Sequence, residues 1–164
     1  TYDTPRAAVL PLIGHLKPGV RYLEPCAGRH DLVDHLAGHA ECVIASDIAP
    51  RDERVFKVDA STITPEDVAA TGAELFITNS PWDRAILHAL IVRFSDILPT
   101  WLLFDADWMH TQQARPYLWR LRRIVSVGRV KWIEDSTMTG KDNAAWYYFD
   151  ARGTGPAEFF GRGL

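Results

Sequence analysis

Residues 20–48, VRYLEPCAGRHDLVDHLAGHAECVIASDI, contain the pattern that decides the predicted fold. The apolar segment 20–25 reads as a strand, a helix is expected over 31–39, and a second strand covers 41–48. Asp31 is the expected N-cap of this helix, and Gly38 lies near its end. A strand, a helix and a strand in this order are typical of an α/β fold.

The same alternation continues along the chain. We expect further helices over 4–16, 64–72, 83–98 and 111–124, the last of them broken at Pro116. We expect further strands over 53–60, 73–80, 100–109, 124–133 and 144–151. The last two strands are joined without a helix and should form an antiparallel hairpin at one edge. The sequence therefore predicts a Rossmann-like α/β fold with a mostly parallel seven-stranded sheet and helices on both faces, followed by an irregular tail over 151–164.

The composition is that of an ordinary globular protein with one core. The chain has 164 residues, of which 47% are hydrophobic and 24% charged. No apolar run approaches the roughly 18 residues of a membrane span, and the start lacks a signal-peptide pattern, so we expect a cytoplasmic protein with no membrane partner. The two cysteines, Cys26 and Cys42, lack CxxC spacing, and the closely spaced histidines lack companion ligands, so no metal site is expected.

Charge is distributed unevenly along the chain. The net charge is −3, but residues 84–131 carry +5 and residues 1–83 carry −6. A basic segment can face phosphates, although an Arg-rich solvated helix face would give the same count. The candidate contacts to a nucleic-acid backbone are Arg84, Arg115, Arg120, Arg122, Arg123, Arg129 and Lys131.

Acidic residues follow three predicted strands, where open α/β sheets bind their ligands. The first strand ends at Glu24 and is followed by Gly28, where the backbone can approach a ligand closely. The second ends at Asp47, where an acid can accept the hydroxyls of a ribose, and the third at Asp59, which could accept from an adenine amine. Each acid alone is equally compatible with a cap or turn. Three in order favour a nucleoside site.

The strand over 73–80 runs into the tetrapeptide Asn-Ser-Pro-Trp, residues 79–82. Asn79 and the adjacent main-chain carbonyls are acceptors, Pro81 stiffens the turn, and Trp82 offers a flat face for stacking. This set suits a planar ring with an exocyclic amine. Both amine protons would be drawn to carbonyls, which would turn the nitrogen lone pair toward an electrophile. The alternative is a turn with a partly buried Trp.

Four motifs resemble those of class I S-adenosylmethionine-dependent methyltransferases: LEPCAG (23–28), SDI (46–48), VDA (58–60) and TNSPW (78–82). They are most similar to amino-methyltransferases that modify adenine N6 or cytosine N4 in nucleic acid, and YDTP (2–5) resembles the N-terminal motif of that group. The motif order matches one permutation class of the adenine enzymes, and the layout is similar to small phage-encoded methyltransferases. The resemblance covers roughly residues 2–150 and implies one catalytic domain over 1–164.

The resemblance implies S-adenosylmethionine as cofactor, S-adenosylhomocysteine as product, no metal, and adenine N6 in DNA as the expected target. Asn79, Ser80, Pro81 and Trp82 would form the catalytic motif, in which Asn79 holds the amine and Trp82 stacks on the base. The residues implied for cofactor binding are Asp3, Thr4, Pro5, Glu24, Cys26, Gly28, Asp47, Asp59 and Asn79. Within this set, Asp47 would bind the ribose, Asp59 the adenine amine, and residues 3–5 would close over the cofactor.

The sequence departs from the family pattern in three ways. His30 stands where many relatives have a second Gly, Ser80 replaces a Pro, and no insertion is long enough for a separate target-recognition domain. Lax specificity, action on single strands, a homodimer or specificity partner, or a different amine therefore stay open. Trp108 and His110 either border the target pocket or serve only in packing and solvation, and 139–143 reads as a loop that could close on substrate.

Two other functions stay open from the sequence. One is an amine methyltransferase that acts on RNA, protein glutamine or a small molecule. The other is a catalytically silent module with the cofactor-binding fold, which binds nucleic acid or a partner subunit.

Overall fold

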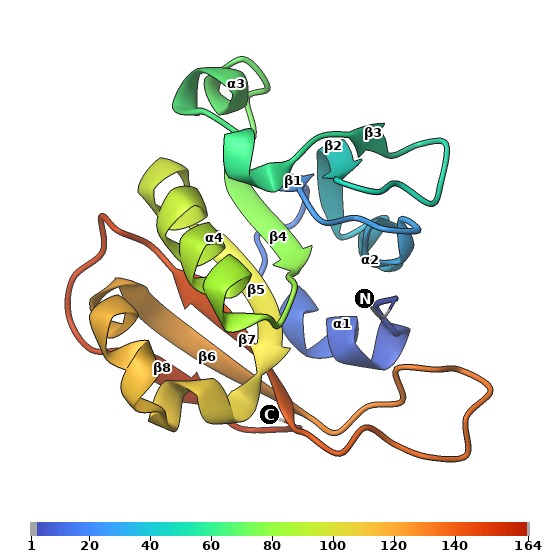
Figure 1. Cartoon of the computed structure of the whole chain (residues 1–164), viewed down its shortest axis with the longest axis vertical. Helices are drawn as coiled ribbons and strands as arrows, with labels where there is room; N and C mark the ends of the chain where they lie inside the picture. The colour runs from blue at the N-terminus through green and yellow to red at the C-terminus, as the bar shows by residue number, and fades with distance from the viewer. Residues whose placement is uncertain (1–2, 164) are drawn as a thin grey trace.

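The computed structural model describes residues 3–163 and contains an eight-stranded sheet (Figure 1). The strands are β1 (Val20–Glu24), β2 (Ala40–Asp47), β3 (Phe56–Lys57), β4 (Leu75–Asn79), β5 (Thr100–Asp105), β6 (Leu121–Gly128), β7 (Ala144–Phe149) and β8 (Glu158–Phe160). Their order is β3-β2-β1-β4-β5-β7-β6-β8. β7 runs antiparallel to β5 and β6, and the other neighbouring strands pair in parallel. The predicted α/β fold with a mostly parallel sheet is confirmed.

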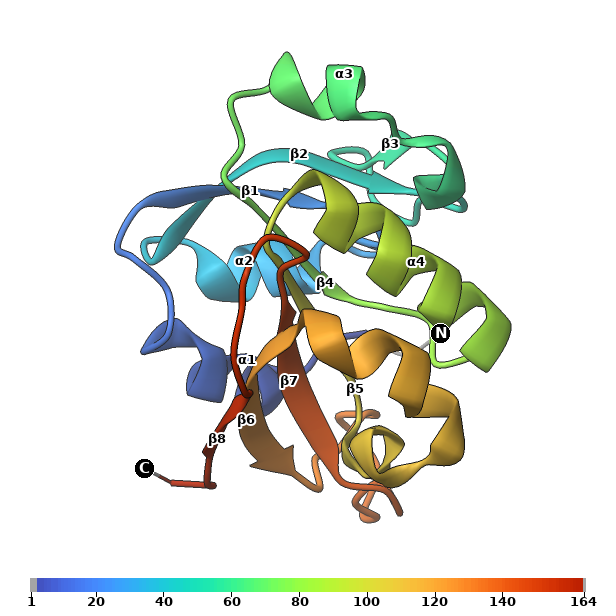
Figure 2. The same cartoon turned by 90° about the vertical axis from the view of Figure 1, so that its left-hand side faces the viewer.

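Helices cover both faces of this sheet. They are α1 (Arg6–Ile13), α2 (Asp31–Leu36), α3 (Pro65–Ala69) and α4 (Arg84–Ile97), with three 3-10 segments, η1 (Ala60–Thr62), η2 (Ala106–His110) and η3 (Gln112–Arg120). Figure 2 shows α4 and the 3-10 segments after β5 on one side of the strands, with α1 and α2 on the other. None of the helices within residues 3–163 combines the length and the apolar character that crossing a bilayer demands.

The alternation of side chains along β4 explains the two layers. Phe76 and Ile77 are both fully buried, yet Phe76 packs in the cluster with α4 and Ile77 in the cluster with α1 and α2. Successive strand residues point to opposite faces, so a strand covered on both sides is apolar at consecutive positions. This is why residues 75–77, LFI, are continuously apolar.

The segment 111–124 differs from the predicted broken helix. Residues 112–120 form the 3-10 segment η3 with Pro116 inside it, and β6 begins at Leu121. A proline removes one backbone donor, which disfavours a regular α-helix here. The side chains of Leu121, Ile124 and Val125 are buried in the sheet, and these tertiary contacts make the segment a strand.

The C-terminal tail also differs from the expectation of irregular structure. Residues 158–160 form β8, which pairs in parallel with β6 and gives the sheet its eighth strand. The β6–β7 hairpin is antiparallel, as expected. It does not form the edge of the sheet, because β8 lies outside β6.

The strand order positions the site. The chain moves outward from β1 to β2 and β3 and then returns to β4 on the other side of β1, so the order reverses between β1 and β4. Ligands of open α/β sheets bind beyond the carboxyl ends of strands at such a reversal. Glu24, Asp47 and Asn79 are the last residues of β1, β2 and β4, which are mutually parallel, so they meet at one edge.

Candidate active site

Asp47 holds the loop between β1 and α2. Its Oδ2 accepts from the Gly28 N–H at 2.9 Å, and its Oδ1 accepts from the Ala49 N–H at 2.8 Å. Gly28 has φ +52°, and a Cβ at this position would lie 2.9 Å from Arg51 Nη2. The loop therefore needs glycine at position 28, both for its backbone conformation and for the close approach of Arg51.

His30 continues this loop in an unusual backbone conformation. Its φ of 75° makes it the one non-glycine residue with positive φ among residues 3–163. An L-residue in this region costs about 1–2 kcal/mol, whereas glycine adopts it freely. Its Nδ1 lies 3.0 Å from Asp34 Oδ1 in the next turn of α2. The backbone thus keeps the shape that glycine favours, although the sequence has histidine.

Asp31 does not cap α2, contrary to expectation. The N-cap position is His30, which makes no side-chain cap hydrogen bond, and Asp31 is the first residue of the helix. The Asp31 carboxyl instead lines a small cavity above the Gly28 loop. Burial, followed by the charge of Asp3, raises its pKa. Sequence reasoning assigned Asp31 to the helix end because an aspartate before an apolar run is a common cap signal.

The small cavity collects many of the residues implied for the cofactor. It is lined by Asp3, Thr4, Cys26, Ala27, Gly28, Asp31, Arg51 and Asn79. Asp3 pairs with Arg51 at 2.5 Å and with Arg29 at 3.4 Å, so the N-terminal segment is fastened over the loop. Pro5 follows as the N-cap residue of α1. Tyr2, from the same N-terminal motif, lies outside the described residues.

Glu24 ends β1 two residues before Cys26, which lines this cavity, and is 1% exposed. Its Oε1 accepts from the Cys26 N–H at 3.0 Å. Burial is the largest effect and raises the pKa of Glu24 to about 8, while the Thr78 hydroxyl and the Cys26 N–H act in the opposite direction. A buried carboxyl without a cationic partner holds its proton because the charged form is poorly solvated. Glu24 is therefore largely protonated at neutral pH.

Asp59 is not among the residues that line the small cavity. Its carboxylate accepts from the Ser61 N–H at 2.9 Å and from the Ser61 hydroxyl at 2.7 Å, which caps η1. These hydrogen bonds lower the pKa of Asp59. In this structure the side chain serves as a helix cap, and its role toward an adenine ring stays a prediction.

Asn79 connects the small cavity to a larger one. Its Nδ2 donates to the Thr4 hydroxyl at 3.1 Å, and Thr4 is 7% exposed. This bond turns the amide so that Oδ1 is left as a free acceptor. Asn79 lines both cavities. The small cavity has a volume of only about 10 Å³, so the Asp3–Arg51 pair that borders it would have to open before a cofactor could occupy this space.

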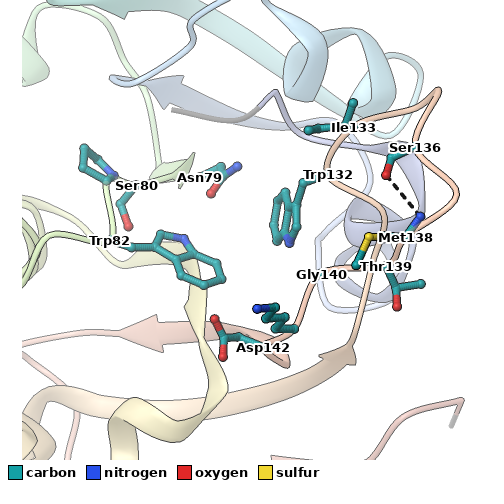
Figure 3. A pocket seen from close by; sticks show the side chains of 12 residues that line it. Asn79, Ser80, Trp82, Trp132, Ile133, Ser136, Met138, Thr139, Gly140 and Asp142 are labelled. Carbon is teal, nitrogen blue, oxygen red and sulfur yellow. Dashed lines mark hydrogen bonds between the residues drawn. The ribbon is translucent and has the colours of Figure 1, made fainter.

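The larger cavity, the target pocket, has a volume of about 560 Å³. It lies between the 79–82 tetrapeptide and the β6–β7 loop, and its lining includes Trp82, Trp132, Ile133, Met138 and Asp142. The indoles of Trp82 and Trp132 meet edge to face, with centroids 5.6 Å apart and an interplanar angle of 89°. Figure 3 shows the Asn79 side chain projecting toward these two rings. A pocket of this size, mostly apolar with a few polar groups, is typical of a small-molecule or base site.

Trp132 was missed by sequence reasoning. It lies close to Gly140, where an added Cβ would be 2.9 Å from Trp132 Cδ1, and the Gly140 N–H donates to the Val130 carbonyl at 2.9 Å. The sequence does place this tryptophan next to a polar loop, which could have indicated a pocket wall. The predicted strand over 124–133 included it instead. The loop 139–143 does border the target pocket, through Thr139, Gly140, Lys141 and Asp142.

Trp108 does not border the target pocket. It is fully buried, and its Nε1 donates to His88 Nε2 at 3.0 Å within the cluster around α4. His110 is exposed at the end of η2 and does not line the target pocket. Ser80 is 3% exposed, and its hydroxyl makes no hydrogen bond with another described residue.

The basic residues between 84 and 131 do not form one surface. Arg84 pairs with Asp105 at 2.6 Å, and Arg120, 9% exposed, pairs with Asp96 at 2.5 Å. Arg122 donates to the carbonyls of Trp119 and Gly155, Arg123 lies over the Tyr148 ring, and Arg115 bonds to Gln112. Arg129 and Lys131 follow β6 and are exposed.

Within residues 3–163, no group of three or more His, Cys, Asp or Glu side chains is placed to hold a metal ion.

Comparison by sequence gives no match, either to a protein-family model or to a curated protein. Comparison with solved structures gives many matches. A dimethyladenosine transferase from Plasmodium falciparum matches with a TM-score of 0.58 and 16% identity, over 92% of this chain and 62% of that one. The 23S rRNA methyltransferase ErmE matches with a TM-score of 0.60 and 15% identity, over 94% of this chain and 71% of that one.

A third similar structure is the M protein of the type I restriction enzyme EcoKI. It matches with a TM-score of 0.56 and 9% identity, over 92% of this chain and 44% of that one. This chain thus spans less than two thirds of the Plasmodium transferase and of the EcoKI subunit. At these identities the likeness concerns the fold: the chain has the Rossmann-like fold of class I methyltransferases.

Proposed function

We propose that the protein transfers a methyl group from S-adenosylmethionine to an exocyclic amine of a nucleic-acid base, with adenine N6 in DNA as the favoured target. The observation that carries the proposal is the place of Asn79, which lines both the small cavity and the target pocket. A methyl group that passes from one ligand to the other must cross at this residue. The methyltransferase fold and the tetrapeptide at residues 79–82 support the same assignment.

The residues around the small cavity fit the chemistry of this cofactor. S-adenosylmethionine carries a sulfonium and an ammonium group, and the acids Asp3, Asp31 and Asp47 lie in or beside the cavity. Asp47 would accept the ribose hydroxyls with its remaining lone pairs. Ile48, which follows Asp47, is 62% exposed and would cover the adenine ring. The Asp3–Arg51 ion pair lies over Gly28, so binding requires this pair to open.

In the target pocket, the protein's contribution is to orient the amine and exclude water. Thr4 fixes the Asn79 amide, so Oδ1 is presented as an acceptor together with the Ser80 main-chain carbonyl. Two acceptors on the two amine protons leave the nitrogen lone pair directed out of the ring plane. The bound cofactor supplies an electrophilic methyl group. The amine nitrogen forms the N–C bond as the C–S bond breaks, and the methylated nitrogen then loses a proton to water, so no general base is required.

Trp82 and Trp132 would hold the base during this step. Trp82 offers its face for stacking, and Trp132 stands at a right angle to it. Stacking on an aromatic side chain is worth about 1–3 kcal/mol per base. A base within a duplex would first have to leave the helix, at a cost of a few kcal/mol, whereas a base in a single strand is already accessible.

The test is nucleoside mass spectrometry with a deuterated methyl label. The protein is incubated with labelled S-adenosylmethionine and with single-stranded DNA, duplex DNA or RNA, and the Asn79→Ala variant serves as the control. We expect label on adenine N6 in DNA for the wild type and no label for the variant. Absence of label on every nucleic acid, with cofactor binding demonstrated by calorimetry, would overturn the proposal. Label on RNA alone or on cytosine N4 would retain the reaction and change the target.

A further inference from the structure

A second concave surface adjoins the target pocket. This flanking groove has a volume of about 580 Å³ and lies between α1, the residues that follow β6, and the C-terminal tail. Its apolar part includes Leu10, Pro11 and Val130, and its basic part consists of Arg129, Lys131 and Arg162. Leu10 is 48% exposed on α1, whose buried residues are Ala8, Val9 and Leu12.

The flanking groove and the target pocket are neighbours that share a lining residue. Thr139 lines both, and Lys131 in the groove precedes Trp132 in the pocket. On the other side, Pro5 lines the groove, and its neighbour Thr4 holds Asn79. β6 is parallel to β5, because both are antiparallel to β7, so the end of β6 lies at the same edge of the sheet as Asn79. A polymer that leaves the target pocket would therefore enter the groove.

The cations of the groove are not used inside the protein. The side chains of Arg129, Lys131 and Arg162 are accessible, and none makes a hydrogen bond or ion pair with another residue of the range 3–163. Arg84 and Arg120, by contrast, are paired with aspartates. The groove contains one acid, Glu134. Three free cations against one acid give it a net positive charge.

Arg162 is brought to the groove by a contact that the sequence does not suggest. Gly128, the last residue of β6, has φ +84°, and a Cβ on it would lie 2.7 Å from Arg162 Nη1. The guanidinium therefore packs directly on the backbone of Gly128. This places a residue of the C-terminal tail beside Arg129, which is next in the chain after Gly128.

We propose that the flanking groove binds the nucleotides next to the target in a single strand of nucleic acid. The phosphates would lie on Arg129, Lys131 and Arg162, and the sugars on Leu10, Pro11 and Val130. Proteins that bind single strands combine a positively charged groove along the backbone with aromatic side chains on which bases stack. Here the groove supplies the cations, and the adjoining target pocket supplies Trp82 and Trp132. Its volume of about 580 Å³ is in the range of small-ligand sites, so the groove is large enough for about one or two nucleotides. This inference rests on the proposed function, because it assigns the target pocket to a base.

The test is fluorescence anisotropy of a labelled oligonucleotide as single-stranded DNA, as single-stranded RNA and as a DNA duplex. We compare wild type with Arg129→Ala/Lys131→Ala and with Arg162→Ala. Matched controls are Lys17→Ala and Lys57→Ala, which remove exposed cations outside the groove. We expect the double variant to bind single strands at least tenfold more weakly and the controls to stay within twofold of wild type. Each lost phosphate contact should reduce the slope of log K against log salt by about 0.7.

A modified oligonucleotide tests the same contacts without any change to the protein, so misfolding of a variant cannot explain the result. An uncharged methylphosphonate in place of the phosphate next to the target, on either side, should weaken binding to the wild type and add little to the loss in the double variant. Equal affinity of wild type and double variant for single strands would overturn the proposal, as would equal losses in the controls. The proposal would also be overturned if the protein bound the duplex preferentially and the groove variants bound it as tightly as wild type. A wild-type dimer that dissociates in the groove variants alone would overturn it too, because the groove would then be a subunit interface.

The two proposals fail separately. Anisotropy measures binding without turnover, so a chain that binds strands through the groove but transfers no methyl group contradicts the proposed function alone. Conversely, labelled adenine from a protein whose groove variants bind strands normally contradicts the groove alone.

Discussion

The Asn79 amide donates to the Thr4 hydroxyl at 3.1 Å, although the two residues are 75 positions apart in the sequence. Thr4 belongs to the segment before α1, and Asn79 ends β4. This bond joins the N-terminal segment to the proposed catalytic tetrapeptide, and it decides which end of the amide faces the target pocket. Thr4 would therefore act on the reaction through Asn79, as a positioning residue.

Thr4→Val should lower kcat roughly five- to tenfold, because a neutral hydrogen bond is worth about 1 kcal/mol and its loss lets the amide rotate. The dissociation constant of the cofactor should change by a smaller factor than kcat. Thr4→Ser, which keeps the hydroxyl, should retain most of the activity. Asn79→Ala should abolish turnover, and adding Thr4→Val to it should have no further effect. Steady-state kinetics and calorimetry test this, and a Thr4→Val variant with wild-type kcat would contradict it.

Asp47→Ala should weaken cofactor binding at least tenfold and lower the free energy of unfolding by about 1–3 kcal/mol, because it leaves the N–H groups of Gly28 and Ala49 without their acceptor. Asp67→Ala is the matched control. It removes a capping-box carboxylate from α3, and should cost about 1 kcal/mol of stability without changing cofactor affinity. Urea unfolding and calorimetry give the two quantities. Loss of stability without loss of affinity in Asp47→Ala would show that the residue only supports the loop.

Glu24 should make stability depend on pH. Burial raises its pKa in the folded protein to about 8, from 4.5 for the free side chain, so the folded state binds the proton more tightly than the unfolded state. The contribution is therefore complete at low pH and is lost as pH rises from about 4.5 through about 8. At roughly 1.4 kcal/mol per pKa unit, the total is a few kcal/mol.

Urea unfolding of wild type and Glu24→Gln between pH 5 and pH 9 tests this dependence. The glutamine side chain of the variant is neutral throughout, so the free energy of unfolding of wild type should fall relative to the variant as pH increases. Parallel curves for the two proteins would contradict the assignment, because the other titrating groups are common to both.

Trp132→Ala should raise KM for an oligonucleotide about tenfold, since it removes one wall of the target pocket and the edge-to-face contact with Trp82. Trp132→Phe should recover part of the loss. Trp119→Ala removes a tryptophan that is 55% exposed and does not line the target pocket, so its kinetics should match wild type. A Trp132→Ala variant with unchanged KM would show that the wall takes no part in binding.

The alternation of strands and helices could be predicted because it depends on local signals. The apolar run at 75–77, the Thr64 cap with Pro65 after it, and the Gly28 turn each act within a few residues of the chain. The reversal of strand order then brings strand ends to one edge, so the neighbourhood of Glu24, Asp47 and Asn79 also followed from the sequence.

Contacts between distant residues decided the rest. The segment after Arg120 became β6 because its apolar side chains are buried against β7, and β8 formed because β6 offered a free edge. The pairing of Arg120 with Asp96, the bond from Thr4 to Asn79, and the approach of Trp132 to Trp82 join residues far apart in sequence. Local propensity carries no information on such partners, because burial and side-chain pairing depend on which surfaces meet after the chain has folded.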